Sequence, residues 1–276
     1  MIRAPSPAKL NLFLHLTGRR EDGYHELQTI FQLIDLYDWL DFEQTKQDSI
    51  EIEGLSHVEL ENNLIFKAAL LLKPFAQQPS GLKIRIEKHI PMGAGLGGGS
   101  SNAATTLIVL NKLWQCQLNL AQLAELGLKL GADVPVFVYG KNAWAEGIGE
   151  RLSFVNLPKK QFIVLKPDCF ISTQLLFSQK ALTRNSKHSK FCAYQLTPSD
   201  FGNNFEPLAK SLYPQVSEAM QYLNQFNTAK LTGTGACVFI EVTKNMNVNE
   251  ILANSPCKAY LVNSLQESPL LQFEVR

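Results

Sequence analysis

The stretch from residue 91 to residue 101 constrains the fold and chemistry of this chain more than any other. In order, its residues are Pro91, Met92, Gly93, Ala94, Gly95, Leu96, Gly97, Gly98, Gly99, Ser100 and Ser101. The glycines let the backbone approach a ligand closely and turn its N–H groups inward. A helix predicted over residues 103–114 follows, and its N-terminus adds partial positive charge. The stretch therefore predicts a phosphate-binding loop; a tight glycine-rich connection without a ligand is the alternative.

Two common nucleotide-binding loops do not fit this stretch. Gly93 and Gly98 have the spacing of a Walker A loop, but the next residue is Gly99 and no lysine follows. Gly93, Gly95 and Gly98 match the dinucleotide pattern, but the preceding strand alternates like an antiparallel one and a second helix follows where a parallel strand belongs. The sequence therefore disfavours both a P-loop enzyme and a nicotinamide or flavin enzyme.

The N-terminal half has the alternating patterns of an α/β protein. Leucines at every second position of residues 8–16 predict a strand with one buried face, and they place Lys9 and Asn11 side by side on the other face. Further strands are predicted at 27–42, 49–53, 82–86 and 136–139, with residues 143–153 as the hairpin partner of the last, and helices at 63–73, 103–114 and 120–130.

Pro158-Lys159-Lys160 is the best candidate for a domain boundary, because it is the first polar, proline-bearing break after two complete layers. We therefore predict an N-terminal domain over residues 1–157 and a C-terminal domain over residues 158–276. Residues 183–200 are polar and predict a surface loop. Beyond them we expect helices at 203–212 and 216–226, a strand, a glycine loop at 232–236, a strand at 237–242, a helix and a last strand.

Charge and cysteine usage exclude several classes of function. The chain has 26 basic and 25 acidic side chains, so no broad positive field exists to hold a nucleic acid or an anionic membrane. Its five cysteines are scattered and odd in number, which argues against a disulfide framework and a zinc site. The N-terminal apolar stretch is too short and too polar for an export signal or a membrane span. We expect a cytoplasmic protein with small-molecule ligands and no structural metal.

Lys9 and Asp133 are the candidate catalytic residues, and Asn11 belongs to the same constellation. A phosphoryl acceptor hydroxyl needs a group to take its proton, and a nearby lysine keeps such a carboxylate ionised and neutralises the moving phosphoryl group. Asp133 lies in a Gly-Ala-Asp-Val-Pro break before an apolar run. The residue types alone leave alternatives open: Asp133 as a turn or cap residue, and Lys9 as a solvated edge lysine.

Tyr24 and His25 follow a predicted Asp-Gly turn. An exposed loop aromatic can stack on a nucleobase, which makes this pair a candidate for base recognition. A loop tyrosine that only covers the core is the alternative.

These motifs together resemble a known superfamily, the galactokinase, homoserine kinase, mevalonate kinase and phosphomevalonate kinase (GHMP) superfamily. The 91–101 loop resembles its phosphate loop, and Thr-Gly-Thr-Gly-Ala-Cys at 232–237 resembles its C-terminal glycine motif. The segments 7–12, 22–27, 131–135 and 145–150 are most similar to those of the branch that phosphorylates a cytidine-diphosphate-linked alcohol.

The resemblance implies a two-domain α/β (α+β) fold. Its N-terminal domain would be like the second domain of ribosomal protein S5, its C-terminal domain would be ferredoxin-like, and the active site would lie in the cleft between them. It also implies transfer of the γ-phosphoryl group of ATP to the 2-hydroxyl of 4-(cytidine 5'-diphospho)-2-C-methyl-D-erythritol, a step of non-mevalonate isoprenoid precursor biosynthesis. Mg²⁺ is expected with ATP, and the sequence identifies no protein ligand for it.

The resemblance also implies roles for individual residues. Asp133 would be the catalytic base and Lys9 its partner, with Asn11 near the acceptor. The loop from Gly93 to Ser101 would hold the ATP phosphates. Tyr24 and Phe177 would sandwich the cytosine, and His25 would read its edge.

Two other functions remain open on the sequence. The first is a kinase of the same superfamily that acts on homoserine or mevalonate. These small acceptors contain no base, so a base-stacking loop at residues 22–25 argues against them. The second is a non-catalytic nucleotide-binding or S5-like RNA-binding module, which the charge balance and the presence of both Lys9 and Asp133 oppose. The chain is expected to be a monomer or a homodimer.

Overall fold

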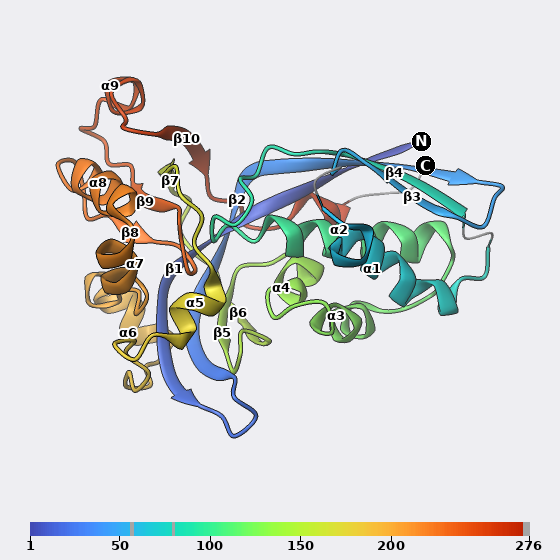
Figure 1. Ribbon diagram of the computed structural model, residues 1–276, viewed down its shortest axis with the longest axis horizontal. Helices are drawn as coiled ribbons and strands as arrows, with labels where there is room; N and C mark the ends of the chain where they lie inside the picture. Colours follow the sequence, from blue (N-terminus) through green and yellow to red (C-terminus); the bar gives the residue numbers. More distant parts are fainter. Residues whose placement is uncertain (56–57, 79–80, 273–276) are drawn as a thin grey trace.

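Two sheets stand side by side along the length of the molecule (Figure 1). The computed structural model describes residues 1–55, 58–78 and 81–272. Within them, the larger sheet has the strand order β3-β4-β2-β5-β6, and β1 also pairs with β2. Its strands are β1 (Ile2–Arg19), β2 (His25–Thr45), β3 (Ile50–Glu53), β4 (Gly81–Glu87), β5 (Ala143–Glu146) and β6 (Arg151–Phe154).

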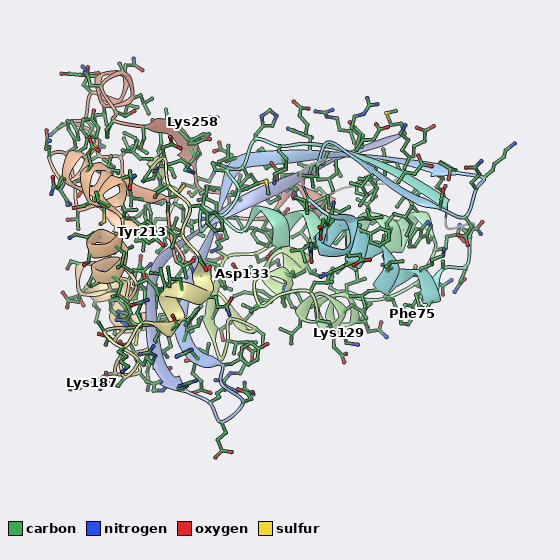
Figure 2. All side chains as sticks on the ribbon, viewed as in Figure 1. Phe75, Lys129, Asp133, Lys187, Tyr213 and Lys258 are labelled. Atoms are coloured by element: carbon green, nitrogen blue, oxygen red, sulfur yellow. The ribbon has the colours of Figure 1, made fainter. Side chains whose placement is uncertain are left out.

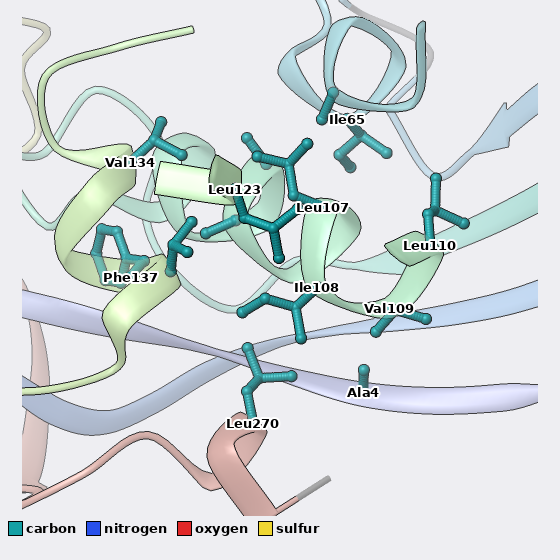
Figure 3. Close-up of a cluster of buried hydrophobic side chains, with 14 of the residues drawn as sticks. Ala4, Ile65, Leu107, Ile108, Val109, Leu110, Leu123, Val134, Phe137 and Leu270 are labelled. Carbon is teal, nitrogen blue, oxygen red and sulfur yellow. The ribbon is translucent and has the colours of Figure 1, made fainter. Parts of the chain in front are cut away.

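Helices pack against the larger sheet and bury its apolar side chains. They are α1 (Leu64–Leu72), α2 (Gly98–Leu113), α3 (Leu120–Leu128) and α4 (Val134–Tyr139), with 3-10 turns η1 (Leu60–Asn62) and η2 (Lys73–Phe75) beside α1. Leu107 and Leu110 of α2 lie in the middle of this core together with Leu123 and Phe137 (Figure 3). The core forms because the buried apolar side chains of these helices remove a large apolar area from water.

The smaller sheet has the strand order β10-β7-β9-β8. Its strands are β7 (Gln161–Lys166), β8 (Lys230–Leu231), β9 (Val238–Glu241) and β10 (Lys258–Asn263). The helices of this half are α5 (Thr173–Ser178), α6 (Phe191–Leu196), α7 (Glu206–Leu212), α8 (Pro214–Leu223) and α9 (Val248–Ala253), with η3 (Pro198–Asp200) after α6. Met220 and Leu223 of α8 lie in the same buried cluster as Ile163 and Leu165 of β7.

Strand β1 is buried on both faces, so the prediction of a single buried face is wrong. The leucines of residues 10–16 are buried as expected, but Lys9, Asn11 and Phe13 are also at most 2% exposed. The reason is that β1 runs between the two halves: Leu10 and Leu12 pack with Phe162 of the smaller sheet. A strand that is buried between two layers is usually a continuous apolar run. Polar and apolar residues alternate in such a strand only where functional polar residues interrupt the run.

The predicted strand at 136–139 is wrong, because these residues lie in helix α4. A short apolar run is compatible with either structure, and the neighbouring residues decide between them. Pro135 lies in the first turn, where its missing N–H costs nothing, and Gly140 ends the helix with a left-handed φ of 61°. The prediction that residues 143–153 are the hairpin partner of a strand at 136–139 is therefore also wrong: these residues form β5 and β6, which pair with each other, and β5 pairs with β2.

The segment 183–200 was predicted as a loop, and in the structure it contains α6 and η3. It is also bonded to the long strands, because the Ser186 N–H donates to the carbonyl of Leu16 at 2.9 Å and the Ser189 N–H donates to Oε1 of Gln28 at 2.9 Å. This segment therefore covers the β1–β2 ribbon.

The end of the chain returns to the N-terminal half, where η4 (Pro269–Gln272) buries Leu270 in the core of the larger sheet (Figure 3). We call residues 264–272 the return strap. Its Leu265 N–H donates to the carbonyl of Leu33 at 2.8 Å, and its Ser268 N–H donates to the carbonyl of Gly140 at 2.7 Å. The boundary predicted at 157/158 falls between β6 and β7, and we propose it as the domain boundary. The return strap follows the C-terminal domain in sequence but packs on the N-terminal half. Among the described residues, none of the helices is both long and apolar enough to cross a membrane.

We predict that Leu270→Ala lowers the free energy of unfolding by about 2–5 kcal/mol, because it leaves a cavity in a packed core. Leu270 is 2% exposed, whereas Leu196 is 83% exposed, so Leu196→Ala is the control and stays within about 0.5 kcal/mol of the parent chain. Urea unfolding followed by tryptophan fluorescence measures both, since Trp114 is buried in the same cluster. Equal midpoints for the two variants would show that the strap is not part of the core.

Candidate active site

The ammonium of Lys9 is the centre of a cluster of polar groups from three parts of the chain. Its Nζ donates to Oδ1 of Asn11 at 2.5 Å and to the carbonyl of Gly95 at 2.9 Å, and lies 3.3 Å from Oδ2 of Asp133. The Phe31 ring centroid is 5.4 Å from the same nitrogen. Two hydrogen bonds and one ion pair thus surround an ammonium that has three donors. Lys9 is therefore a fully partnered buried charge, and its reading as a solvated edge lysine is wrong.

Asp133 is the member of this cluster that reaches open space. Its side chain is 33% exposed, against 3% for that of Lys9. It precedes α4 but makes no side-chain hydrogen bond that caps the helix, so helix capping does not explain it. In the view of Figure 2 it lies near the middle of the molecule, between the two halves. A partly exposed carboxylate fixed by an ammonium can accept a proton from a bound molecule.

Asn11 connects the cluster to the C-terminal half. Its Nδ2 donates to Oγ1 of Thr29 at 2.9 Å, which leaves Oδ1 to face Lys9. Its backbone N–H donates to Oγ1 of Thr232 at 2.9 Å, and the Thr232 hydroxyl donates to the carbonyl of Gly95 at 3.3 Å. Thr232 therefore joins β1 to the 91–101 loop, a role that the sequence analysis did not predict.

The 91–101 loop has a backbone that side chains would block. Gly93, Gly95 and Gly97 have φ values of 60°, 76° and 73°, all in the left-handed region. A Cβ on Gly95 would lie 2.1 Å from the carbonyl oxygen of Thr232. Gly97 precedes the 16-residue helix α2, and its flanking position provides no side-chain cap for the first N–H groups of that helix. The loop and the helix start therefore present backbone donors that suit a phosphate.

Two cavities lie on the two sides of this loop and share Gly93, Gly95 and Gly97 as a wall. One has a volume of about 340 Å³ and is lined by the loop, by α1 and by Lys88. The other has a volume of about 460 Å³ and is lined by Lys9, Asn11, Asp133 and side chains of the C-terminal half. We call them the loop cavity and the acceptor cavity. A group held by the loop can reach both cavities.

Lys88 is a functional candidate that the sequence analysis missed. Its ammonium donates to Oδ2 of Asp38 and, at 3.1 Å, to Oδ1 of Asn102. Asp38 is fully buried and also accepts from the N–H groups of His89 and Ile90 at 2.8 Å each. The only sequence signal was a lysine between a strand and the glycine loop.

The predicted base-recognition residues fall into two places. Phe177 lines the acceptor cavity, and the His25 ring lies against it with centroids 4.9 Å apart. Tyr24 is 60% exposed on the β1–β2 turn, and neither Tyr24 nor His25 itself lines this cavity. Nε of Arg184 donates to Nε2 of His25 at 2.9 Å. Burial lowers the pKa of His25, and the charges of Arg184 and Arg19 lower it further, so the ring is neutral near pH 7.

Within the described part of the chain, no three His, Cys, Asp or Glu side chains gather as a metal-binding group. The described residues thus offer no complete protein cage for a cation.

Comparison with known proteins places this geometry in a family. The model for the GHMP kinases N terminal domain matches residues 63–141, and the model for the GHMP kinases C terminal matches residues 188–260. A solved mevalonate kinase from Methanococcus jannaschii, 19% identical, covers 96% of this chain with a TM-score of 0.70 and shares its fold. The two-domain α/β fold predicted from the resemblance is confirmed. The chain is a GHMP kinase.

More similar relatives define the branch. The 4-diphosphocytidyl-2-C-methyl-D-erythritol kinase of Acinetobacter baumannii is 74% identical over 275 residues, which are 100% of this chain and 99% of the relative. That of Acinetobacter baylyi is 71% identical over 99% of both chains. A crystal structure of 4-(cytidine 5'-diphospho)-2C-methyl-D-erythritol kinase, 31% identical, covers 95% of this chain and 99% of its own with a TM-score of 0.81. The chain belongs to the 4-diphosphocytidyl-2-C-methyl-D-erythritol kinase family.

We predict that Gly95→Ala destabilises the protein by at least about 1–3 kcal/mol, because alanine resists a φ of 76° and its Cβ meets the Thr232 carbonyl. Gly99→Ala is the matched control: a Cβ there meets only Leu64 Cδ1 at 3.5 Å, and Gly99 lies in the first turn of α2. Thermal unfolding should show a lower midpoint for the first variant and an unchanged or higher one for the second. A Gly95→Ala protein as stable as its parent contradicts the loop geometry.

Proposed function

We propose that the chain transfers the γ-phosphoryl group of ATP to the 2-hydroxyl of 4-(cytidine 5'-diphospho)-2-C-methyl-D-erythritol, releasing the 2-phosphate and ADP. This reaction is a step of non-mevalonate isoprenoid precursor biosynthesis. The observation that carries the proposal is the Lys9–Asp133 pair, 3.3 Å apart, in a cavity that the glycine loop separates from a second cavity.

In this proposal the loop from Pro91 to Ser101 holds the ATP phosphates. The backbone N–H groups of the loop and of the α2 N-terminus supply hydrogen bonds and partial positive charge. Lys88, which lines the loop cavity, adds a full positive charge nearby. Magnesium would neutralise charge on the β- and γ-phosphates. ATP and Mg²⁺ are thus accommodated without an excess of basic residues in the chain.

The oxygen of the acceptor hydroxyl bonds to the γ-phosphorus while the bond between that phosphorus and the leaving oxygen of ADP breaks. Asp133 accepts the proton that the hydroxyl loses. Lys9 holds the Asp133 carboxylate in place, and its charge stabilises the negative charge on the transferred group. Asn11 fixes the Lys9 ammonium through its Oδ1. The roles of Lys9 and Asp133 are therefore those of a positioned ion pair, with Asn11 beside the acceptor.

The cytidine end of the acceptor is proposed to bind where Phe177 and His25 meet at the edge of the acceptor cavity. Phe177 and Tyr24 would stack on the two faces of the cytosine, with His25 at its edge. Because Tyr24 is 60% exposed on the β1–β2 turn, it would move onto the base as the substrate binds.

The working form of the enzyme is proposed to be a monomer or a homodimer in the cytoplasm, with neither nucleic acid nor membrane as a partner. The near balance of 26 basic and 25 acidic side chains supports this view.

The experiment that tests the function is ADP release by the purified protein with ATP and Mg²⁺. The acceptors compared are the cytidylylated methylerythritol, the uncytidylylated alcohol phosphate, homoserine and mevalonate. We expect turnover with the first only. Nucleotide binding without turnover on any acceptor would replace the proposal with a non-catalytic module.

We predict that Asp133→Asn lowers kcat by about 10²- to 10⁴-fold, because the amide cannot take the hydroxyl proton. ATP binding, measured by calorimetry, should stay close to that of the parent protein. Asp200→Asn, at an exposed position, is the control and should leave kcat unchanged. A variant at position 133 with the parent kcat would remove Asp133 from the chemistry.

We predict that Tyr24→Ala raises KM for the cytidine substrate more than it lowers kcat, because stacking contributes equally to the ground and transition states. Tyr24→Phe keeps the ring and should retain the parent KM. Steady-state kinetics at saturating ATP measures both variants. An unchanged KM in Tyr24→Ala would mean that this exposed ring does not contact the base.

A further inference from the structure

Arg184 lies in the segment between α5 and α6, and all three nitrogens of its guanidinium are engaged. Nε donates to Nε2 of His25 at 2.9 Å, and Nη1 donates to the carbonyl of Leu182 at 3.0 Å. Nη2 donates to the carbonyls of Phe177 and Gln179, each at 2.8 Å. One side chain therefore holds both His25 and Phe177, which come from opposite halves of the sequence.

The bond to His25 determines where the imidazole carries its proton. A guanidinium in a protein stays charged and has donors only. The nitrogen that it faces, Nε2 of His25, must therefore offer its lone pair. A neutral imidazole with a free lone pair on Nε2 has its proton on Nδ1. The lowered pKa of His25 agrees with a ring that stays neutral in this position.

The same contacts place this ring beside Phe177, a residue of the acceptor cavity wall. Phe177 lines the cavity and packs edge to face on Phe205, with centroids 4.9 Å apart. The His25 ring lies against Phe177 with an interplanar angle of 30°. Because Arg184 also bonds the Phe177 carbonyl, it links the His25 ring to the backbone of a residue that lines the cavity. The ring that carries the Nδ1–H donor is therefore held next to one wall of the cavity.

We propose that Arg184 is a specificity-determining positioning residue: it fixes the Nδ1–H tautomer of His25, and this donor selects cytosine over uracil. N3 of cytosine carries a lone pair and accepts such a donor, whereas N3 of uracil carries a hydrogen and opposes it. The opposite tautomer would favour uracil. The inference rests on the proposed function, since it concerns recognition of the same cytidine substrate.

The first test needs no substrate. Nitrogen-15 NMR of His25 in the parent protein should show a protonated Nδ1 and an unprotonated Nε2 at pH 7. Arg184→Met, which has no donors, should give a mixture of the two tautomers. Arg19→Met is the matched control: Arg19 pairs with His25 across the β1–β2 register and its charge also lowers the pKa of His25, but no hydrogen bond from its side chain to His25 occurs among the described residues. It should keep the single tautomer. A parent protein with the proton on Nε2 overturns the proposal, whatever the variants do.

The second test measures discrimination as the ratio of kcat/KM for the cytidine substrate to kcat/KM for its uridine analogue. Arg184→Met should lower this ratio by about tenfold or more, the size of one hydrogen bond made or opposed. Arg19→Met should leave it unchanged. An Arg184→Met protein with the parent ratio overturns the proposal while the kinase activity stands. A parent protein that turns over neither substrate instead overturns the proposed function, and the NMR result still decides the tautomer.

Discussion

The burial of one positive charge organises this active site. Lys9 is 2% exposed, and an ammonium removed from water to that extent is strongly destabilising unless each of its donors has an acceptor. The acceptors come from β1, from the glycine loop and from the residue that precedes α4, through Asn11, Gly95 and Asp133. The chain cannot satisfy Lys9 without bringing these three elements to one place. Partnering Lys9 on folding therefore also assembles the site.

The return strap forms hydrogen bonds to the elements that carry this ion pair. Leu33 lies opposite Lys9 in the β1–β2 register, and its carbonyl accepts from Leu265 of the strap. At the other side, Ser268 of the strap donates to Gly140, which ends the helix that Asp133 begins. Glycine is required at that end because its φ is 61° and a Cβ would lie 3.0 Å from strap side chains. The last residues of the C-terminal half thus fix both partners of a pair that belongs to the N-terminal half.

Local patterns predicted what local physics determines. The alternation of apolar residues predicted strands, and the spacing of the glycines predicted the 91–101 loop. The two-residue period of a strand placed Lys9 beside Asn11. The helix at α4 was missed because six apolar residues suit a buried strand as well as a buried helix, and the decision lies with Pro135 and Gly140. Arg184 and Lys88 were missed for another reason: their partners lie 159 and 50 residues away in the sequence. Such contacts exist only in the folded chain, so no window of sequence contains them.

The two sides of the glycine loop carry the same three residue types with different exposure, and exposure decides their roles. On one side Lys9 faces Asn11 and Asp133; on the other, Lys88 faces Asn102 and Asp38. Asp38 is fully buried and its oxygens already accept from two backbone N–H groups, from the Asn102 amide and from Lys88, so no lone pair faces a ligand. Asp133 is one-third exposed and opens into the acceptor cavity. A carboxylate can take a proton only from a group that reaches it, which favours Asp133 over Asp38 as the proposed base and leaves Asp38 as a support for the loop.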